Sequence, residues 1–448
     1  MARKVFLSVL GTGFYEKCNY CKDNFCTKEP TRFIQIASLK YHEVEKWKKD
    51  DAVFILMTNK SRELNWQTSV SKTRCKNKYD NPEEYIGLEE ELKALNLPII
   101  NKIDQNIPDG NNEKEMWKIF DTLYSIIEEE DELYVDLTHS FRYIPMLMMV
   151  FCNYAKFLKK IKVKSITYGN IFYKINDIPT INDITTLTVL QDWTSAADSF
   201  ITSGNIEKIS KIYLPEINER LSNTKGKDEH AKVLRFFINN TKSLVNELQL
   251  CQGKRLIEAD TISKAQISIE NISELDLPSP FKPILEKIEK SIKPFDNSNN
   301  VKNGIVAAKW CCDNGLFQQA ITMLQESVVS MVCEVMNLDW HKKNKRKYVN
   351  NAFIIISNKD VNNSGNWELP EDEDFSDKDK KKIIKKIISI PLVNDLAESF
   401  SKLTAYRNKI NHGTMLYNEG QFSNVDNVAE TIKKMTEYIY NITYCESK

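Results

Sequence analysis

Arg407, Asn408, Asn411 and His412 lie near the end of the 448-residue sequence, where they bring a permanent cation, two amides and an imidazole within about one and a half helical turns. Attack of a ribose 2′-hydroxyl on the adjacent phosphodiester needs proton transfer at both oxygens and positive charge beside the developing phosphorane, and it needs no metal. His412 could transfer the proton, whereas Arg407 keeps its own and suits a bidentate grip on phosphate. Asn408 and Asn411 would position backbone or substrate. Together the four residues are suited to cutting RNA.

The spacing of Arg407 and His412 is weak evidence by itself, because five histidines and ten arginines in 448 residues produce it by chance about 0.1 times. A chain of this length suggests two or three domains. Lys plus Arg and Asp plus Glu balance at 62 each, so the sequence has no overall basic excess. Any phosphate-binding site must therefore be local.

The N-terminus contains only a short apolar run, and no apolar span of about 18 residues occurs anywhere in the sequence. We therefore expect a cytoplasmic protein with no membrane partner, in which the ten cysteines are reduced thiols. Cys18, Cys21 and Cys26 form a cluster, with Cys75 further on, and a C-x2-C start could bind zinc. No second C-x2-C or paired histidine follows at ligand spacing, so a loop with ordinary cysteines is favoured and no metal or other cofactor is expected.

Short apolar runs alternate with helical stretches from Arg3 to about Ile184, which is typical of a largely parallel sheet covered on both faces. The predicted strands are Lys4–Leu10, Ala52–Thr58, Pro98–Ile103, Glu132–Leu137 and Val163–Tyr168. The predicted helices are Ile36–Trp47, Glu84–Leu95, Lys114–Glu129 and Pro145–Lys160. Ligands bind such sheets beyond the carboxyl ends of the strands, so the loops that follow the strands are candidate binding sites.

Three of these loops contain turn-forming or small residues. The first is Gly11-Thr12-Gly13-Phe14, where small residues allow backbone N–H groups to approach a phosphate. It is not a dinucleotide-binding fingerprint, because Glu16 stands where the third glycine belongs. The second is Thr58-Asn59, which leads into Asn65-Trp66. The third is Pro108-Asp109-Gly110, a turn signal before the next helix.

The fourth loop, Asp136-Leu137-Thr138-His139-Ser140-Phe141-Arg142, runs from a predicted strand into a helix entered through Pro145. Its polar residues lie at a helix N-terminus, where backbone amides and the helix dipole also favour an anion. Asp136 or Thr138 could instead cap the helix. Capping explains one of the five polar residues in this loop, so ligand binding is the favoured interpretation for Thr138, His139, Ser140, Phe141 and Arg142.

Taken in order, Leu10 to Gly13, Thr58 with Asn65-Trp66, Ile107 to Gly110 and Asp136 to Arg142 resemble the motifs of CRISPR-associated CARF-domain proteins, the Csx1/Csx2 (Csm6-like) family of type III systems. The ribonuclease motif of that family is an Arg, four to six residues and a His on a helix of a HEPN domain, and Arg407 to His412 is similar to it position for position. The resemblance covers roughly the first 180 and the last 140 residues. Ser140 departs from it, because glycine is expected there.

The resemblance implies a Rossmann-like α/β CARF domain with a parallel central sheet at residues 1–186. An all-α connector at 187–300 and an all-α HEPN ribonuclease domain at 301–448 would follow. It also implies two-fold homodimers that bind a ring of linked adenylates at Gly11 to Gly13 and Thr138 to Arg142 and then cut single-stranded RNA in antiviral defence. Cyclic tetra-adenylate is the expected activator by family frequency alone. Assembly beyond the dimer, RNA sequence preference and degradation of the activator are left open.

Residues 187–300 show a helical pattern without recognisable chemistry, and His230 within them is interpreted as a packed or solvated side chain. The Arg407 helix is predicted to end at Gly413, and a last helix is predicted at Val425–Tyr440.

A polar insertion at about 339–382 contains the acidic block Glu371–Asp374 and the basic block Lys378–Lys382. Such charge runs are usually solvated and mobile, and this interpretation is favoured over RNA binding. His341 is a candidate RNA contact on the grounds of local basicity alone.

Two other function classes fit parts of the sequence. A CARF nucleotide sensor or regulator without nuclease activity would act through protein or DNA contacts, although no helix-turn-helix is evident and the neutral charge argues against DNA. A Rossmann oxidoreductase is disfavoured by the missing third glycine and by the absence of an acidic residue at the required distance.

Overall fold

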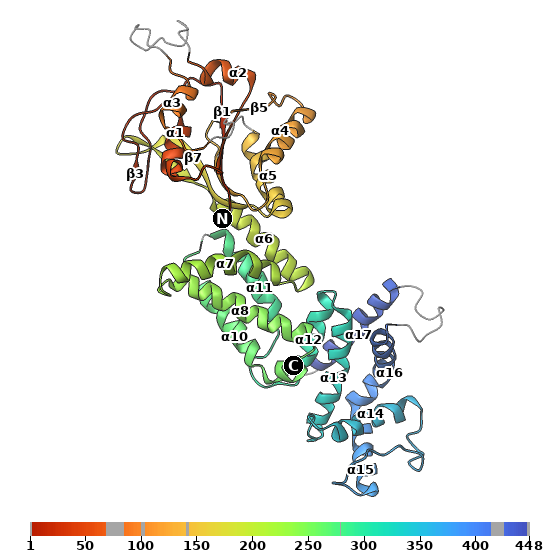
Figure 1. The fold of residues 1–448 in the computed structure, drawn as a ribbon. Helices are drawn as coiled ribbons and strands as arrows, with labels where there is room; N and C mark the ends of the chain where they lie inside the picture. The colour runs from red at the N-terminus through yellow and green to blue at the C-terminus, as the bar shows by residue number, and fades with distance from the viewer. Residues whose placement is uncertain are drawn as a thin grey trace. The chain divides into compact units, whose positions relative to one another are not determined.

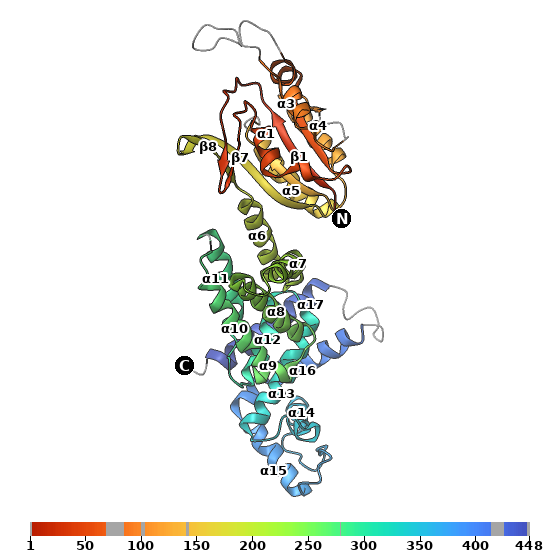
Figure 2. The ribbon, with the colours of Figure 1, turned by 60° about the vertical axis from the view of Figure 1, so that its left-hand side comes forward.

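The computed structural model describes residues 2–68, 85–99, 104–139, 143–277, 279–413 and 425–445. The chain forms two compact units, Met1–Gln191 and Asp192–Lys448. The first unit is α/β and the second contains helices only in its described residues (Figures 1 and 2). The Rossmann-like and all-α fold classes are therefore confirmed. The further division of the second unit at residue 300 stays a prediction.

The first unit is built on one eight-stranded sheet with the strand order β3-β2-β8-β7-β6-β1-β4-β5. Around the central strand β1 the pairs β1–β4, β1–β6, β4–β5 and β6–β7 are parallel, whereas β7–β8 and β2–β3 are antiparallel. The strands are β1 (Lys4–Leu10), β2 (Cys21–Lys22), β3 (Phe25–Cys26), β4 (Ala52–Met57), β5 (Asp104–Asn106), β6 (Glu132–Asp136), β7 (Lys162–Ile175) and β8 (Ile178–Asp183).

Helices cover both faces of this sheet because the side chains of β1 alternate between two cores. Val5, Leu7 and Val9 pack with α4 (Glu113–Ile126) and α5 (Ile144–Lys159). Phe6 and Leu10 pack on the opposite face with α1 (Ile34–Tyr41), the 3₁₀ turn η1 (Val44–Lys46) and α3 (Leu88–Ala94). Figure 1 shows these helices on either side of β1. A strand with two buried faces explains the continuous apolar run in the sequence.

Two strand predictions need correction. The strand predicted at Pro98–Ile103 is wrong for Pro98 and Ile99, because neither residue lies in a strand of the structure. Residues 100–103 lie outside the described residues. The strand β5 begins at Asp104. β7 continues seven residues beyond the predicted end at Tyr168 and pairs with β8, which was not predicted. Asn176 and Asp177 connect them with φ of 51° and 63°, the left-handed conformation that a tight hairpin turn requires.

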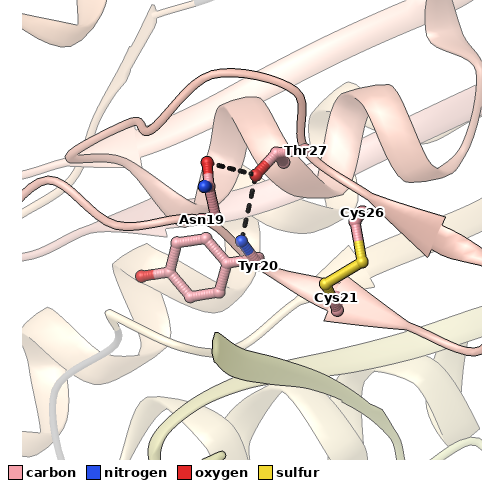
Figure 3. Close-up of a disulfide and its surroundings, with 5 residues drawn as sticks. All are labelled: Asn19, Tyr20, Cys21, Cys26 and Thr27. Atoms are coloured by element: carbon pink, nitrogen blue, oxygen red, sulfur yellow. Dashed lines mark hydrogen bonds between the residues drawn. A yellow bond between two sulfur atoms is a disulfide. The ribbon is translucent and has the colours of Figure 1, made fainter. Parts of the chain in front are cut away.

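The expectation that all cysteines are reduced is wrong for Cys21 and Cys26. The short hairpin β2–β3 places them directly opposite each other, with their Cα atoms 4.2 Å apart, and they form a disulfide (Figure 3). Thr27 supports the hairpin, because its Oγ1 accepts a hydrogen bond from the Tyr20 N–H at 3.0 Å and donates to Asn19 Oδ1 at 3.2 Å. Local spacing did not reveal this pair, since the register of a hairpin with two-residue strands depends on its packing against β8.

Cys18, Cys152, Cys251, Cys311, Cys312 and Cys333 are free thiols. Among the residues that the structure describes, no group of three or more His, Cys, Asp or Glu side chains could hold a metal ion. Within the same residues, no helix has both the length and the apolar character needed to cross a membrane.

The predicted helical pattern of the second unit is confirmed. Its helices are α6 (Thr186–Ser203, which begins in the first unit), α7 (Glu207–Asn223), α8 (Glu229–Gln249), α9 (Gly253–Glu258), α10 (Asp260–Ser273), the 3₁₀ turn η3 (Ser279–Phe281), α11 (Lys282–Ile292), α12 (Lys302–Asp313), α13 (Phe317–Val335), α14 (Lys343–Ser357), α15 (Asp377–Ile388), α16 (Pro391–Asn411) and α17 (Val425–Cys445). The candidate catalytic residues and the side chains around them lie on helices α13, α14 and α16.

The polar insertion contains α14 and the start of α15, and the expectation of a solvated acidic block is wrong for Asp372. Its side chain is buried and lies 2.7 Å from the Lys345 ammonium group of α14, which also contacts Asp374 at 2.7 Å. A buried charge needs such a partner, and the pairing could not be inferred from two charge runs in sequence. The basic block lies on α15, where Ser376 accepts a hydrogen bond from the Asp379 N–H at the helix N-terminus.

Candidate ligand-binding and catalytic sites

The glycine loop that follows β1 lies against the fourth predicted loop. A Cβ atom at Gly11 would be 2.6 Å from the His139 carbonyl oxygen and 2.6 Å from the Tyr15 hydroxyl oxygen, so only glycine allows this approach. Gly11 is buried and Thr12 is half-buried, whereas Gly13 and Phe14 are exposed. The structure therefore brings the first and fourth loops together at the carboxyl edge of the sheet.

Thr58 follows β4 and has a structural role. Its hydroxyl accepts a hydrogen bond from the Ser61 N–H at 3.2 Å, its own N–H donates to Ser61 Oγ at 2.9 Å, and its side chain is buried. This capping box begins the short helical turn α2 (Asn59–Ser61), on which Asn59 is exposed. The binding role predicted for Thr58 and Asn59 remains a prediction.

Asn65 is the residue of the second loop that reaches the glycine loop. It lies on the π-helical turn η2 (Arg62–Trp66) and donates hydrogen bonds from Nδ2 to the carbonyl oxygens of Gly11 at 2.7 Å and Gly13 at 2.9 Å. The sequence interpretation missed this role. The only sequence signal for this role was that Asn65 belongs to the motif Asn65-Trp66.

The third loop contacts the start of α5. Gly110 has a φ of 74°, and a Cβ atom there would lie 1.3 Å from the Tyr143 hydroxyl oxygen. The same hydroxyl donates to the Asp109 carbonyl oxygen at 3.4 Å. Glycine is therefore required at position 110 for both the backbone conformation and the contact.

Thr138 links the segment that follows β6 to the middle of β7. Its hydroxyl donates to the buried Asp136 carboxylate and accepts from the Gly169 N–H at 2.8 Å, and Ser8 Oγ also donates to Asp136 at 2.7 Å. Burial raises the pKa of Asp136, and these hydrogen bonds partly offset that effect. Neither Asp136 nor Thr138 caps α5, because Tyr143 occupies the N-cap position and no side-chain hydrogen bond caps the helix.

His139 stacks on the Tyr15 ring with centroids 3.8 Å apart. Its Nε2 atom is buried and has no hydrogen-bond partner among the described residues. Burial lowers the pKa of His139 to about 3, so the ring is neutral at pH 7. The ring therefore packs against Tyr15 and adds no positive charge to this edge of the sheet. The neighbouring predicted ligand contacts Ser140, Phe141 and Arg142 lie outside the described residues.

Acid pH should destabilise the first unit through His42 and His139. Burial lowers the pKa of His42 to about 4 and that of His139 to about 3, against about 6.5 in the unfolded chain. Below pH 6.5 these histidines bind protons in the unfolded chain but stay neutral in the folded chain. The free energy of unfolding therefore decreases as the pH falls toward 4. Each histidine should contribute about 1.6 kcal/mol of this loss between pH 6.5 and 5.

Calorimetry of the full chain at pH 7 and pH 5 tests this effect. We expect the melting transition of the first unit to move to lower temperature at pH 5, and His42→Gln to reduce the movement. His230→Gln on α8 is the matched control, because His230 is exposed in the second unit. An equal movement in His42→Gln and in the unsubstituted protein would contradict the assignment.

The predicted catalytic residues lie at the C-terminal end of α16. His412 follows the last helical residue, and its N–H donates to the Asn408 carbonyl oxygen at 3.0 Å. Gly413 has a φ of 61° and ends the helix as predicted. Arg407 and Asn408 are half-buried, whereas Asn411 and His412 are exposed.

Arg407 contacts two side chains that would orient its guanidinium group. It donates to Asn408 Oδ1 at 3.2 Å, and it lies 3.4 Å from Oε1 of Glu326 on α13. The other carboxylate oxygen of Glu326 contacts Arg346 of α14 at 2.6 Å. One carboxylate therefore lies between two arginines. Because the contact with Arg407 is long and half-exposed, it is weak enough for a phosphate to replace it.

Sequence reasoning missed Glu326 and Arg346, because they lie on other helices and no local pattern links them to Arg407. The ring of the predicted RNA contact His341 lies against the Trp340 ring, with centroids 3.6 Å apart and the planes tilted by 31°. Arg346 donates to the Trp340 carbonyl oxygen at 3.2 Å. His341 is thus connected through Arg346 and Glu326 to Arg407. Its contact with RNA stays a prediction.

Comparisons with known proteins identify the first unit. The family model described as "CRISPR system endoribonuclease Csx1, CARF domain" matches residues 5–172. The CRISPR-associated protein MJ1674 of Methanocaldococcus jannaschii is 28% identical over 298 residues, which cover 62% of this chain and 42% of that protein. The chain therefore spans less than half the length of this relative.

A solved structure of Enterococcus italicus Csm6 bound to cyclic hexa-2′-fluoro-hexa-dAMP aligns with 99% of this chain and 95% of that chain. The identity is 9% and the TM-score is 0.35, too low to support an argument about this chain. The match to the family model is confined to residues 5–172, within the first unit. The chain is a CARF-containing protein similar to Csx1, and its CARF domain occupies residues 5–172.

Proposed function

We propose that this protein is a cyclic-oligoadenylate-activated endoribonuclease of type III CRISPR antiviral defence, which cuts single-stranded RNA without a metal. The match of residues 5–172 to the CARF domain of an endoribonuclease carries the proposal. The similarity to MJ1674 covers 62% of the chain, more than the 191 residues of the first unit, so it also involves part of the helical unit. Arg407 and His412 at the end of α16 supply the reaction chemistry.

In the proposed reaction Arg407 holds the scissile phosphate, and His412 transfers protons between the 2′-hydroxyl and the leaving oxygen. The products are a 2′,3′-cyclic phosphate or 3′-phosphate end and a 5′-hydroxyl end. Asn408 supports the guanidinium through its 3.2 Å hydrogen bond. One histidine cannot be acid and base at the same moment, so a second copy of the motif from a two-fold partner would complete the site.

An exposed apolar stripe on α5 supports the proposed homodimer. Met146, Val150, Tyr154 and Phe157 recur at intervals of three or four residues, which places them on one face of the helix. Val150 is 61% exposed and Phe157 is 83% exposed in the single chain. An apolar face of this kind is typical of a surface that is covered by a partner.

The double substitution Val150→Glu and Phe157→Glu should separate the dimer. Two carboxylates at an apolar contact would repel their symmetry copies, while the fold should persist because both side chains are exposed. We expect a monomer in sedimentation experiments and at least a tenfold loss of activated RNA cleavage (about 1.4 kcal/mol). Leu250→Glu, at a residue that is 69% exposed in the helical unit, is the control. A dimer that survives the double substitution would exclude this face.

Addition of cyclic tetra-adenylate, cyclic hexa-adenylate or linear oligoadenylates to the protein with a labelled single-stranded RNA tests the whole proposal. We expect cleavage with a cyclic activator, undiminished in excess EDTA. Loss of cleavage in EDTA would indicate a metal mechanism. Binding of the ring without cleavage under any condition would favour a sensor without nuclease activity. A protein that binds no oligoadenylate would contradict the proposal.

A further inference from the structure

Buried side chains hold two backbone carbonyl groups of the glycine loop and one of the residue that follows it. Asn65 uses both N–H groups of its amide for the carbonyl oxygens of Gly11 and Gly13, at 2.7 and 2.9 Å. Arg32 donates to the carbonyl oxygen of Tyr15 at 3.1 Å. Asn65 is 0% exposed and Arg32 is 7% exposed. The loop therefore turns alternate carbonyl groups toward the protein interior.

Peptide geometry determines what the other side of the loop presents. In a trans peptide the C=O of one residue and the N–H of the next point in opposite directions. Carbonyl groups of Gly11 and Gly13 that face Asn65 therefore direct the N–H groups of Thr12 and Phe14 away from it. Because the carbonyl oxygens of Gly11 and Gly13 face Asn65, these two partly negative atoms are absent from the opposite side of the loop. That side therefore favours an anionic ligand such as a phosphodiester.

Tyr85 fixes the orientation of the Asn65 amide. Its hydroxyl donates to Asn65 Oδ1 at 2.8 Å, which assigns the oxygen and leaves the nitrogen to donate to the loop. Tyr85 is 1% exposed, and the Arg32 guanidinium lies over its ring at 4.8 Å and over the Phe14 ring at 5.6 Å. Asn65, Tyr85 and Arg32 thus form one buried support for the loop.

We propose that Asn65 is a positioning residue for the ligand: it presets the loop Gly11 to Phe14 so that backbone N–H groups meet a phosphodiester of the bound ring. This inference rests on the proposed function, because it assumes that the loop binds a cyclic oligoadenylate. It assigns a role to a side chain that does not itself touch the ligand.

Asn65→Asp tests the positioning role of Asn65. The introduced carboxylate would face the carbonyl oxygens of Gly11 and Gly13 and could not donate hydrogen bonds to them. We expect the affinity for cyclic tetra-adenylate, measured by equilibrium binding, to fall between about tenfold and a hundredfold. Tyr85→Phe keeps the ring and removes the donor to Asn65, so its loss should be smaller. Lowering the pH should protonate the introduced carboxyl group, restore one donor and recover part of the affinity. Asn65→Ala should show no such recovery.

Gln35→Glu is the matched control. Gln35 is also buried, and its amide donates to the Val9 carbonyl oxygen at 3.0 Å, two residues before the loop. Both acidic substitutions should lower the melting temperature, but only Asn65→Asp should weaken binding to the folded protein. Equal affinity of Asn65→Asp and unsubstituted protein, or an equal loss in Gln35→Glu, would overturn the positioning role. If the unsubstituted protein binds neither cyclic tetra-adenylate nor cyclic hexa-adenylate, the proposed function fails instead.

Discussion

His412→Ala is expected to lower the rate of activated RNA cleavage by about 10²- to 10⁴-fold, the usual contribution of a general acid or base. In the proposed dimer both copies lose the proton-transfer group at once, so no second histidine of the motif can substitute. The affinity for the cyclic activator should stay unchanged, because the substitution lies in the helical unit and the loops of the CARF domain are untouched. A single-turnover cleavage assay and an equilibrium binding assay measure the two quantities.

His341→Ala is the control for this prediction. His341 is exposed like His412 and lies in the same unit, but it packs against Trp340 and is not part of the Arg407 helix. Both substitutions remove an exposed imidazole and should change stability by less than about 0.5 kcal/mol. Retained cleavage in His412→Ala would remove His412 from the catalytic site. A loss of similar size in both variants would indicate a role for histidines in RNA binding and not in proton transfer.

Arg407→Ala is expected to reduce cleavage by about 10²- to 10³-fold, comparable to the loss of one preorganised donor to a developing oxyanion. The guanidinium group would stabilise the additional negative charge of the phosphorane, so the effect should fall mainly on the rate at saturating RNA. Arg407→Lys keeps the charge but loses the planar guanidinium group, which can donate hydrogen bonds to two phosphate oxygens at once. It should recover only part of the rate. Single-turnover rates at saturating RNA distinguish the three proteins.

Arg255→Ala provides a matched control for the arginine. Arg255 lies 3.4 Å from the carboxylate of Glu247, the same separation as between Arg407 and Glu326, and it belongs to the same unit. Its removal breaks an ion pair of the same separation without touching the predicted motif. Full activity in Arg407→Ala, or an equal loss in Arg255→Ala, would show that Arg407 has no specific part in the reaction.

Much of the fold could be predicted because its signals are local. The uninterrupted apolar run of β1 follows from burial on both faces, and the helices follow from apolar residues at intervals of three and four. Gly413 ends α16 with a φ of 61°, a conformation that glycine adopts without strain. The first and fourth predicted loops meet at the carboxyl edge of the sheet, because parallel strands end on the same side.

The arrangement around the candidate sites required the tertiary structure. Asn65 reaches Gly11 across 54 positions of sequence, and Glu326 reaches Arg407 across 81. Spacing along a chain reports the period of a helix or strand and carries no information on which distant segments become neighbours. The buried pair of Lys345 with Asp372 was missed for the same reason. The disulfide joins cysteines only five positions apart, and it was missed because it depends on the register of the short β2–β3 hairpin.

The amino-acid sequence by itself determined the α/β and helical organisation, the loops that follow the strands and the grouping of Arg407 with His412 on one helix end. Only the tertiary structure decided how those loops are held. It placed the Thr58 and Thr138 hydroxyls in internal hydrogen bonds, buried the His139 ring against Tyr15 and assigned the support of the glycine loop to Asn65. A residue type states which hydrogen bonds a side chain can make, whereas burial and neighbours decide which of them it makes.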